Sequence, residues 1–370
     1  MAALDRLGPE ERLLCVTARV PQTGDDAVPA ELRDPQLDWD AYWNLALRHE
    51  VQPLVWAFLR ASRGRRAAVP ERLARQAERR YFATVVRNGN RAAELGRVLS
   101  ALGTAGVSAM PVKGVVLDEL VYGPDVPRTF DDLDVLVRRA ELPRARKALA
   151  ELGYYGRPAP RFEEVDHRFH DVQLFRPVAG GEQCLEVHWD LWPAARFDSM
   201  LDDLWRRSVT ARVGGVETRV LSMEDTLLHL AIHRTSSALR LRFICDVAEI
   251  VRQRSHDLDW EQLEARAAGV QARVALHMVL MLARELLAAP VPDRILARTR
   301  PGMLRRRLLE RTCGTSALFR RVGRDDHRQQ PRLAYRVLEQ DRPARVARSI
   351  VAGALRKRAK LAYNRRTRSA

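Results

Sequence analysis

The chain has 370 residues, 46% of them hydrophobic and 30% charged, which is ordinary for a soluble globular protein with two or three domains. Charged residues interrupt its most apolar stretch, residues 275–291, and its acidic N-terminus has no basic-then-apolar export pattern, so we expect a cytoplasmic protein without a membrane span. A net charge of +16 could indicate a nucleic-acid partner. However, only four of the 63 basic residues are lysine, and this skew toward arginine indicates biased codon usage more than selection for phosphate contacts.

Residues 1–105 are predicted to form a helical N-terminal region. Apolar residues recur at three- and four-residue spacing over residues 39–58, which predicts an amphipathic pair of helices broken near Pro53. A long helix is expected over residues 70–105. Asn88 lies on the apolar stripe of that helix, where it either reaches a nucleotide or serves as a hydrogen-bonded core amide.

A small sheet is expected to begin at residues 106–111, with Lys113 and Gly114 in the turn that follows. The next helix, over residues 115–121, would direct its free N–H groups and the positive end of its dipole toward this turn, which suits a triphosphate. Lys113 adds a positive charge. It either contacts phosphate or pairs with one of the acidic residues further along the chain.

The second strand, over residues 132–137, has the pattern D-L-D-V-L-V. Side chains alternate between the faces of a strand, so Asp132 and Asp134 share one face with Cα atoms roughly 7 Å apart. Such a pair can ligate divalent cations, although a bare D-x-D is also typical of an edge strand with a solvated face. Arg128, just before the strand, either contacts phosphate or pairs with Asp131.

A helix over residues 141–152 and a strand over residues 172–175 lead to a further strand, residues 184–191. Glu186 on that strand supplies a third carboxylate. Three carboxylates on one sheet surface are the arrangement that two-metal phosphoryl or nucleotidyl transfer requires. His188 faces the same side as Glu186 and is expected to orient a carboxylate or a substrate hydroxyl, or to be a buried histidine with satisfied hydrogen bonds.

Other histidines and the cysteines give weaker signals. A zinc site of His170, His188 and Glu186 lacks tight ligand spacing. His229 and His233 are four residues apart, which can hold a metal, but no glutamate of the H-E-x-x-H type accompanies them, so we expect core or cleft-facing histidines. The four cysteines form no C-x-x-C pair and are expected to be reduced, mostly buried thiols.

The C-terminal part is predicted to be helical over residues 222–300, starting at a Ser222 cap, with a helix over residues 239–251 and two more over residues 258–290. Residues 301–370 form an arginine-rich tail that is helical or partly disordered. Ten of its last thirty residues are basic and one is acidic. Such a tail can bind RNA, an anionic membrane or an acidic partner, although a solvated terminus is the simpler expectation.

Together these motifs resemble the uncharacterised bacterial nucleotidyltransferase family, which has a polymerase-beta-like palm. The resemblance extends from about Trp43 to about Val251. The residues that carry it are Val112-Lys113-Gly114, Arg128, Asp132-Leu133-Asp134 with Leu136-Val137, Glu186-Val187-His188-Trp189, Leu227-Leu228-His229-Leu230 with His233, and the segment from Leu241 to Val247.

The resemblance implies a metal-dependent nucleotidyltransferase with Asp132, Asp134 and Glu186 as metal ligands. It also implies that the helical C-terminal region closes the cleft, so that Arg242 reaches a phosphate and Asp246 orients His233. One departure concerns the turn before the acids. Better-known palm transferases have a Gly-Ser turn there, whereas this chain has Lys113-Gly114, so their mode of triphosphate binding cannot be transferred.

We therefore predict an α+β protein with a small mixed-sheet nucleotidyltransferase palm (residues 106–221) between the two helical regions. It would move a nucleoside monophosphate from an NTP to a hydroxyl of a small molecule or protein, with two Mg²⁺ ions as the expected cofactor. The predicted catalytic and metal ligands are Asp132, Asp134 and Glu186, and the predicted nucleotide contacts are Lys113, Gly114, Arg128, His188 and Arg242. The alternatives are a non-catalytic nucleotide-binding or scaffold protein, whose basic tail docks RNA or an acidic partner, and an RNA nucleotidyltransferase.

Overall fold

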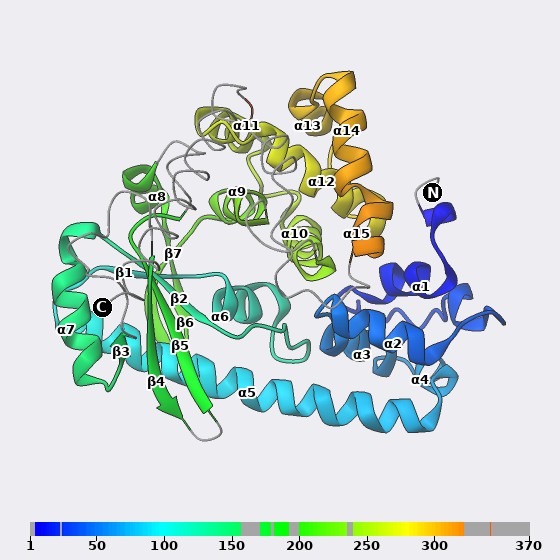
Figure 1. The fold of residues 1–370 in the computed structure, drawn as a ribbon, viewed down its shortest axis with the longest axis horizontal. Helices are drawn as coiled ribbons and strands as arrows, with labels where there is room; N and C mark the ends of the chain where they lie inside the picture. Colours follow the sequence, from blue (N-terminus) through cyan, green and yellow to red (C-terminus); the bar gives the residue numbers. More distant parts are fainter. Residues whose placement is uncertain are drawn as a thin grey trace, which may run out of the picture.

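The computed structural model describes residues 4–22, 24–156, 171–178, 181–191, 200–234, 240–321 and 341. Figure 1 shows a small sheet at one end of the molecule, a helical body at the other, and one long helix, α5, running beneath both. This architecture confirms the predicted α+β class with a mixed sheet flanked by helical regions. Among the described residues, no helix is long and apolar enough to cross a membrane.

The N-terminal region is helical, as predicted. Its elements are η1 (Leu4–Arg6), α1 (Pro9–Thr17), η2 (Ala30–Arg33), α2 (Trp39–Arg48), α3 (Gln52–Arg60), α4 (Arg63–Ala68) and α5 (Glu71–Thr104). The Asp38 carboxylate caps α2 by accepting the N–H groups of Asp40 and Ala41. Pro53 lies in the first turn of α3, where a missing N–H costs nothing, so the predicted break between the two helices falls just before it.

Five strands form the main sheet in the order β1-β2-β5-β4-β3, in which β2 and β5 are parallel and the other pairs antiparallel. The strands are β1 (Ala109–Val112), β2 (Leu133–Val137), β3 (Tyr155–Gly156), β4 (Asp171–Val178) and β5 (Gly181–His188). Every residue of β2 is buried, because its two faces join two different cores. Leu133, Val135 and Val137 pack with α5, whereas Leu136 joins the core of the helical body.

The four predicted strands all differ from the structure at their boundaries: β1 covers Ala109–Val112 instead of residues 106–111, and β4 covers Asp171–Val178 instead of residues 172–175. β2 begins at Leu133, so Asp132 lies just before the strand instead of within it. β5 runs from Gly181 to His188 and not from residue 184 to 191, because pairing with β4 continues back to the hairpin end at Gly181. Beyond His188 the chain bends, and the Asp190 carboxylate accepts the N–H of Leu191.

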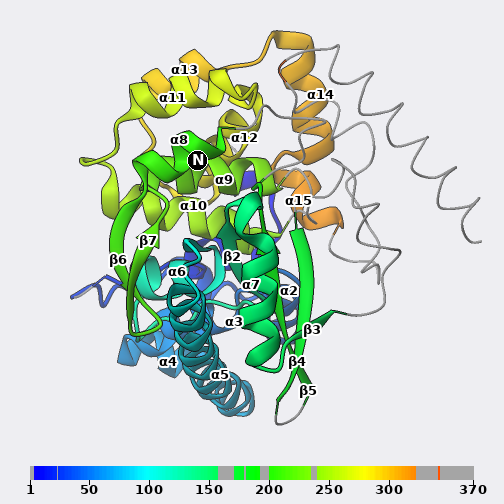
Figure 2. The same cartoon turned by 90° about the vertical axis from the view of Figure 1, so that its left-hand side faces the viewer.

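Short elements connect the strands. They are α6 (Gly114–Leu117), η3 (Asp118–Tyr122), η4 (Arg139–Glu141), α7 (Leu142–Glu151), α8 (Leu201–Arg207) and the two-stranded hairpin β6 (Val209–Val213) and β7 (Val216–Val220). The helix expected over residues 115–121 begins as α6 and widens into a π-helical turn, η3. In Figure 2, α5 is seen nearly end-on between the β6–β7 hairpin and α7.

The tight turn of that hairpin rests on α5. Gly214 has a φ of 58°, and its carbonyl oxygen lies 2.2 Å from where a Cβ on Gly96 would be. We expect Gly96→Ala to lower the free energy of unfolding by about 1–3 kcal/mol, since backbone must move to admit the methyl group. Gly89 on the same helix has open space around it, so Gly89→Ala should raise stability by up to about 1 kcal/mol. Urea unfolding of both variants tests this, and an equal effect would contradict it.

The C-terminal region is helical, as predicted. Its elements are α9 (Met223–Arg234), α10 (Leu241–Arg254), α11 (Trp260–Gly269), α12 (Arg273–Leu287) and α13 (Asp293–Thr299). Two further helices, α14 (Met303–Cys313) and α15 (Thr315–Arg321), lie in the segment expected to be an arginine-rich tail. Ser222 caps α9 as expected, because its hydroxyl accepts the N–H of Asp225 at 3.2 Å. The basic helix expected over residues 344–370 lies outside the described residues.

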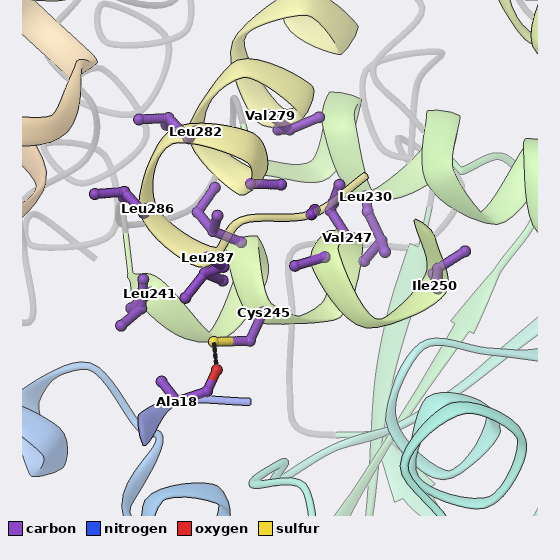
Figure 3. Close-up of a cluster of buried hydrophobic side chains, with 14 of the residues drawn as sticks. Ala18, Leu230, Leu241, Cys245, Val247, Ile250, Val279, Leu282, Leu286 and Leu287 are labelled. Carbon is purple, nitrogen blue, oxygen red and sulfur yellow. Dashed lines mark hydrogen bonds between the residues drawn. The ribbon is translucent and has the colours of Figure 1, made fainter. Parts of the chain in front are cut away.

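Helices α9, α10 and α12 meet in a leucine-rich core (Figure 3). The buried Cys245 thiol donates a hydrogen bond to the Ala18 carbonyl at 3.3 Å, which joins this core to the N-terminal region. Cys15, Cys184 and Cys245 carry free thiols, and the first and last of them are buried, as the sequence predicts.

His49 makes the stability of this body depend on pH. Its ring is fully buried and accepts the N–H of Leu241, and burial lowers its pKa to about 3. The unfolded chain therefore binds a proton below pH 6.5 that the folded chain rejects, so stability falls as the solution is acidified. Lowering the pH from 7.5 to 5.5 should cost about 1.4 kcal/mol through this residue.

Chemical denaturation of wild type and His49→Asn at both pH values tests this expectation. The Asn amide oxygen can still accept the N–H of Leu241 but does not titrate, so the variant should lose less stability on acidification. Asp118 opposes the trend in both proteins, because burial raises its pKa to about 6. Equal acid sensitivity of the two proteins would contradict the assignment to His49.

Candidate metal and nucleotide site

Three potential metal ligands converge on one face of the main sheet. Asp134 on β2 is the register partner of Glu186 on β5, and His188 follows two residues later on the same face. Adjacent strands lie about 4.8 Å apart, so this register brings the side chains together. One ligand atom from each of the three residues lies within 4.8 Å of the others.

His188 joins the two carboxylates. Its Nε2 lies 3.0 Å from Asp134 Oδ1 and 3.5 Å from Glu186 Oε2, and its ring is buried. The expectation that His188 orients a carboxylate agrees with these contacts. Gln173 on β4 also donates to Glu186, at 2.8 Å, and so fixes the second carboxylate from the other side.

Lys113 points into the same cluster. Its Nζ lies 2.5 Å from Asp134 Oδ1, so the structure shows the ion pair that was one of the two expected roles of this lysine. The Lys113 backbone has a φ of 55°, which non-glycine residues rarely adopt. Gly114 follows in close contact with the chain before β2: a Cβ there would lie 3.2 Å from the Phe130 ring and 3.3 Å from the Asp132 carbonyl oxygen.

The charges of these groups depend on one another. Burial alone would raise the pKa of Asp134, but Lys113 and His188 hold it well below its usual range. The hydrogen bond from His188 likewise lowers the pKa of Glu186. Burial opposes protonation of His188, yet its bonds to the two carboxylates raise its pKa above the usual value. The cluster therefore holds two carboxylates in the ionised form that a divalent cation requires.

Asp132 lies beside this cluster at the exposed end of β2. Burial, and then the charges of Glu186 and Asp134, raise its pKa. Burial, and then the charges of Asp132 and Glu186, raise the pKa of the nearby Cys184 thiol to about 12. The sequence pattern did not single out Cys184, although its place two residues before Glu186 on the same face was a signal.

Arg128 is tied to the helical body. Its guanidinium is 5% exposed and donates two hydrogen bonds of 2.7 Å to Asp246 on α10. The expected pairing of Arg128 with Asp131 is therefore wrong; Asp131 pairs with Arg91 at 3.4 Å. Tyr122 also donates to Asp246, at 2.9 Å.

Asp246 was expected to orient His233, and its carboxylate accepts hydrogen bonds from Arg128 and Tyr122. Arg128 therefore forms its ion pair with a residue of the protein itself, Asp246, and this pair holds the segment that leads into β2.

Arg242 and Asn88 hold the same segment from its two sides. Arg242 donates to the Thr129 carbonyl at 2.8 Å and pairs with Glu50 at 3.0 Å. Asn88 donates to Asp118 at 3.0 Å and to the Arg128 carbonyl at 2.9 Å, which confirms the core-amide alternative for this residue. These residues position the approach to the acidic cluster, and Glu50 is a contributor that sequence periodicity did not reveal.

The two histidines of α9 lie near the Lys113 side of the cluster. Their ring centroids are 5.7 Å apart, and His229 and Lys113 line one small cavity. Burial and then the positive charge of Lys113 lower the pKa of His233 well below its usual value. Within the described ranges, the group with metal-ligand geometry contains neither histidine. The zinc alternative included His170, which lies outside those ranges.

The structure thus has a small mixed sheet, flanked by helices, with acidic residues in register on two adjacent parallel strands. This is the arrangement that the sequence motifs predicted for a nucleotidyltransferase palm. The model of a family described as uncharacterised nucleotidyltransferases matches residues 35–288. The chain belongs to this family and is a nucleotidyltransferase by that membership, which confirms the resemblance. Searches of curated proteins and of solved structures find no match.

Proposed function

We propose that the protein transfers a nucleoside monophosphate from an NTP to a hydroxyl group of a small molecule or protein, in a reaction that depends on a divalent cation and releases pyrophosphate. One observation carries the proposal: Asp134 and Glu186 are register partners on adjacent parallel strands, and with His188 they offer three ligand atoms within 4.8 Å. Membership of a nucleotidyltransferase family supports the reaction class.

The donor set fits a hard divalent cation. Two ionised carboxylates and a histidine nitrogen suit Mn²⁺, and carboxylates with water suit Mg²⁺. Asp132, beside the other two acids, completes the ligands needed if two ions bind. When bound, such ions neutralise phosphate charge and make the acceptor hydroxyl a better nucleophile.

The chain's own residues would divide the remaining work. His188 holds Asp134 and Glu186 in place through its hydrogen bonds. Glu186 would help to take the proton from the acceptor hydroxyl. Lys113 and Gly114 would hold triphosphate oxygens beside the cluster, whereas Arg128 and Arg242 act through the segment that they anchor.

A labelling screen tests this function. Purified protein is incubated with each of the four α-³²P-labelled NTPs, Mg²⁺ or Mn²⁺, and extract of the source cells. Label that moves to a small molecule or protein, together with pyrophosphate release, supports the proposal. Absence of transfer with every nucleotide and both metals contradicts it.

The non-catalytic alternative draws on the ion pair between Lys113 and Asp134, which neutralises the candidate metal ligand from within the chain. It predicts calorimetric NTP binding of equal strength with and without Mg²⁺, and no pyrophosphate release. RNA as acceptor or partner would depend on the tail, and it predicts RNA affinity that falls steeply with salt and a flatter fall after truncation at Asp341.

A further inference from the structure

The buried Asp134 carboxylate can pair either with the Lys113 ammonium or with a divalent metal ion. The Lys113 ammonium lies 2.5 Å from Asp134 Oδ1, and the side chains of the two residues are 13% and 7% exposed. The same Asp134 belongs to the group whose ligand atoms are close enough to hold a metal ion. A divalent ion bound to Asp134 would lie next to the buried Lys113 ammonium. The two positive charges would repel each other strongly, because little water is present to screen them.

The local backbone holds Lys113 in this place. Its left-handed φ of 55° lies between β1 and α6, where the flanking Val112 and Gly114 are both buried. A strained non-glycine conformation persists only when its surroundings enforce it, and such strain gathers at functional sites. The flexible four-carbon stem of lysine still allows the ammonium to move while the backbone stays fixed.

We propose that Lys113 is a displaceable internal counter-cation: its ammonium neutralises Asp134 while no metal ion is bound, and it swings to the triphosphate when ion and nucleotide enter together. The inference rests on the proposed function, since the ion in question is the one that nucleotidyl transfer would use. The metal ion alone then binds weakly, because it must expel the ammonium. Nucleotide strengthens metal binding, because its phosphates give the ammonium a new partner.

Amine labelling of the wild-type protein tests the displacement without any variant. The protein is treated with an acetylating reagent, and modification of Lys113 is compared by mass spectrometry with that of Lys147, an exposed lysine on α7 that serves as internal standard. Saturating Mn²⁺ should raise labelling of Lys113 roughly fivefold or more, and added NTP analogue should lower it again. Labelling of Lys113 that Mn²⁺ leaves unchanged or reduces would overturn the proposal.

Metal affinity provides the second test. Mn²⁺ binding without nucleotide, measured by electron paramagnetic resonance, should be on the order of tenfold tighter for Lys113→Met than for wild type. Lys147→Met is the matched control and should bind as wild type does. Equal or weaker binding by Lys113→Met would overturn the proposal. If Lys113→Met does not fold, the labelling result decides.

Glu186→Gln separates this inference from the proposed function. If Mn²⁺ binding survives in Glu186→Gln, the ion is held elsewhere and the proposed function itself fails. If binding is lost in Glu186→Gln while Lys113 labelling in wild type ignores Mn²⁺, the metal site stands and only the displacement is wrong.

Discussion

Asp134→Asn is expected to abolish nucleotidyl transfer, with the rate falling on the order of 10²–10³-fold. The substitution keeps the shape of the side chain but removes the charge that Lys113 and His188 stabilise in its ionised form. An amide oxygen is a much poorer ligand for a divalent cation than a carboxylate. The measurement is transfer from α-labelled NTP under the conditions that the screen identifies.

Two further variants make this experiment decisive. Glu186→Gln should cause a loss of the same order while leaving the ion pair between Lys113 and Asp134 intact, so a defect common to both variants cannot come from that pair. Asp131→Asn is the matched control, because its side chain is 70% exposed and pairs with Arg91 across 3.4 Å. It should retain nearly full activity. Wild-type rates in both Asp134→Asn and Glu186→Gln, with circular dichroism showing intact folds, would rule out the proposed mechanism.

Asp246→Ala is expected to be strongly destabilising, lowering the free energy of unfolding by about 3–5 kcal/mol. The Asp246 side chain is fully buried and accepts from Arg128, whose guanidinium is 5% exposed. Removing the carboxylate leaves this guanidinium charged and unpaired away from water, and it also removes the acceptor of the Tyr122 hydroxyl. Urea denaturation followed by circular dichroism measures the loss.

The control for this variant is an ion pair at the surface. Arg138 and Asp202 pair at 3.2 Å, but their side chains are 46% and 88% exposed. Asp202→Ala should therefore cost less than about 1 kcal/mol. Similar losses for the buried and exposed pairs would show that Arg128 relaxes toward water when its partner is removed. Asp246→Ala should also slow transfer, because Arg128 anchors the segment that leads into β2.

The alternation of side chains in β2 and β5 was predictable from sequence, and so was the face that carries the acids. Leu133, Val135 and Val137 enter one core while Asp134 lies on the other side, because a strand repeats every two residues whatever surrounds it. The long helix α5 and the Ser222 cap followed for the same reason: helical periodicity and capping depend on a few neighbouring residues. Family resemblance then indicated what the acids are for.

Only the tertiary structure determined which charged side chains form ion pairs with one another. Arg128 was expected either to contact phosphate or to pair with Asp131, but it binds Asp246, 118 positions away, because α10 packs against the segment that Arg128 occupies and buries both groups. Lys113 had two possible roles, and only the approach of β1 to β2 brought it to Asp134. A backbone pattern is set locally and can be predicted from a window of sequence, whereas an ion pair depends on which distant surfaces come together and exclude water.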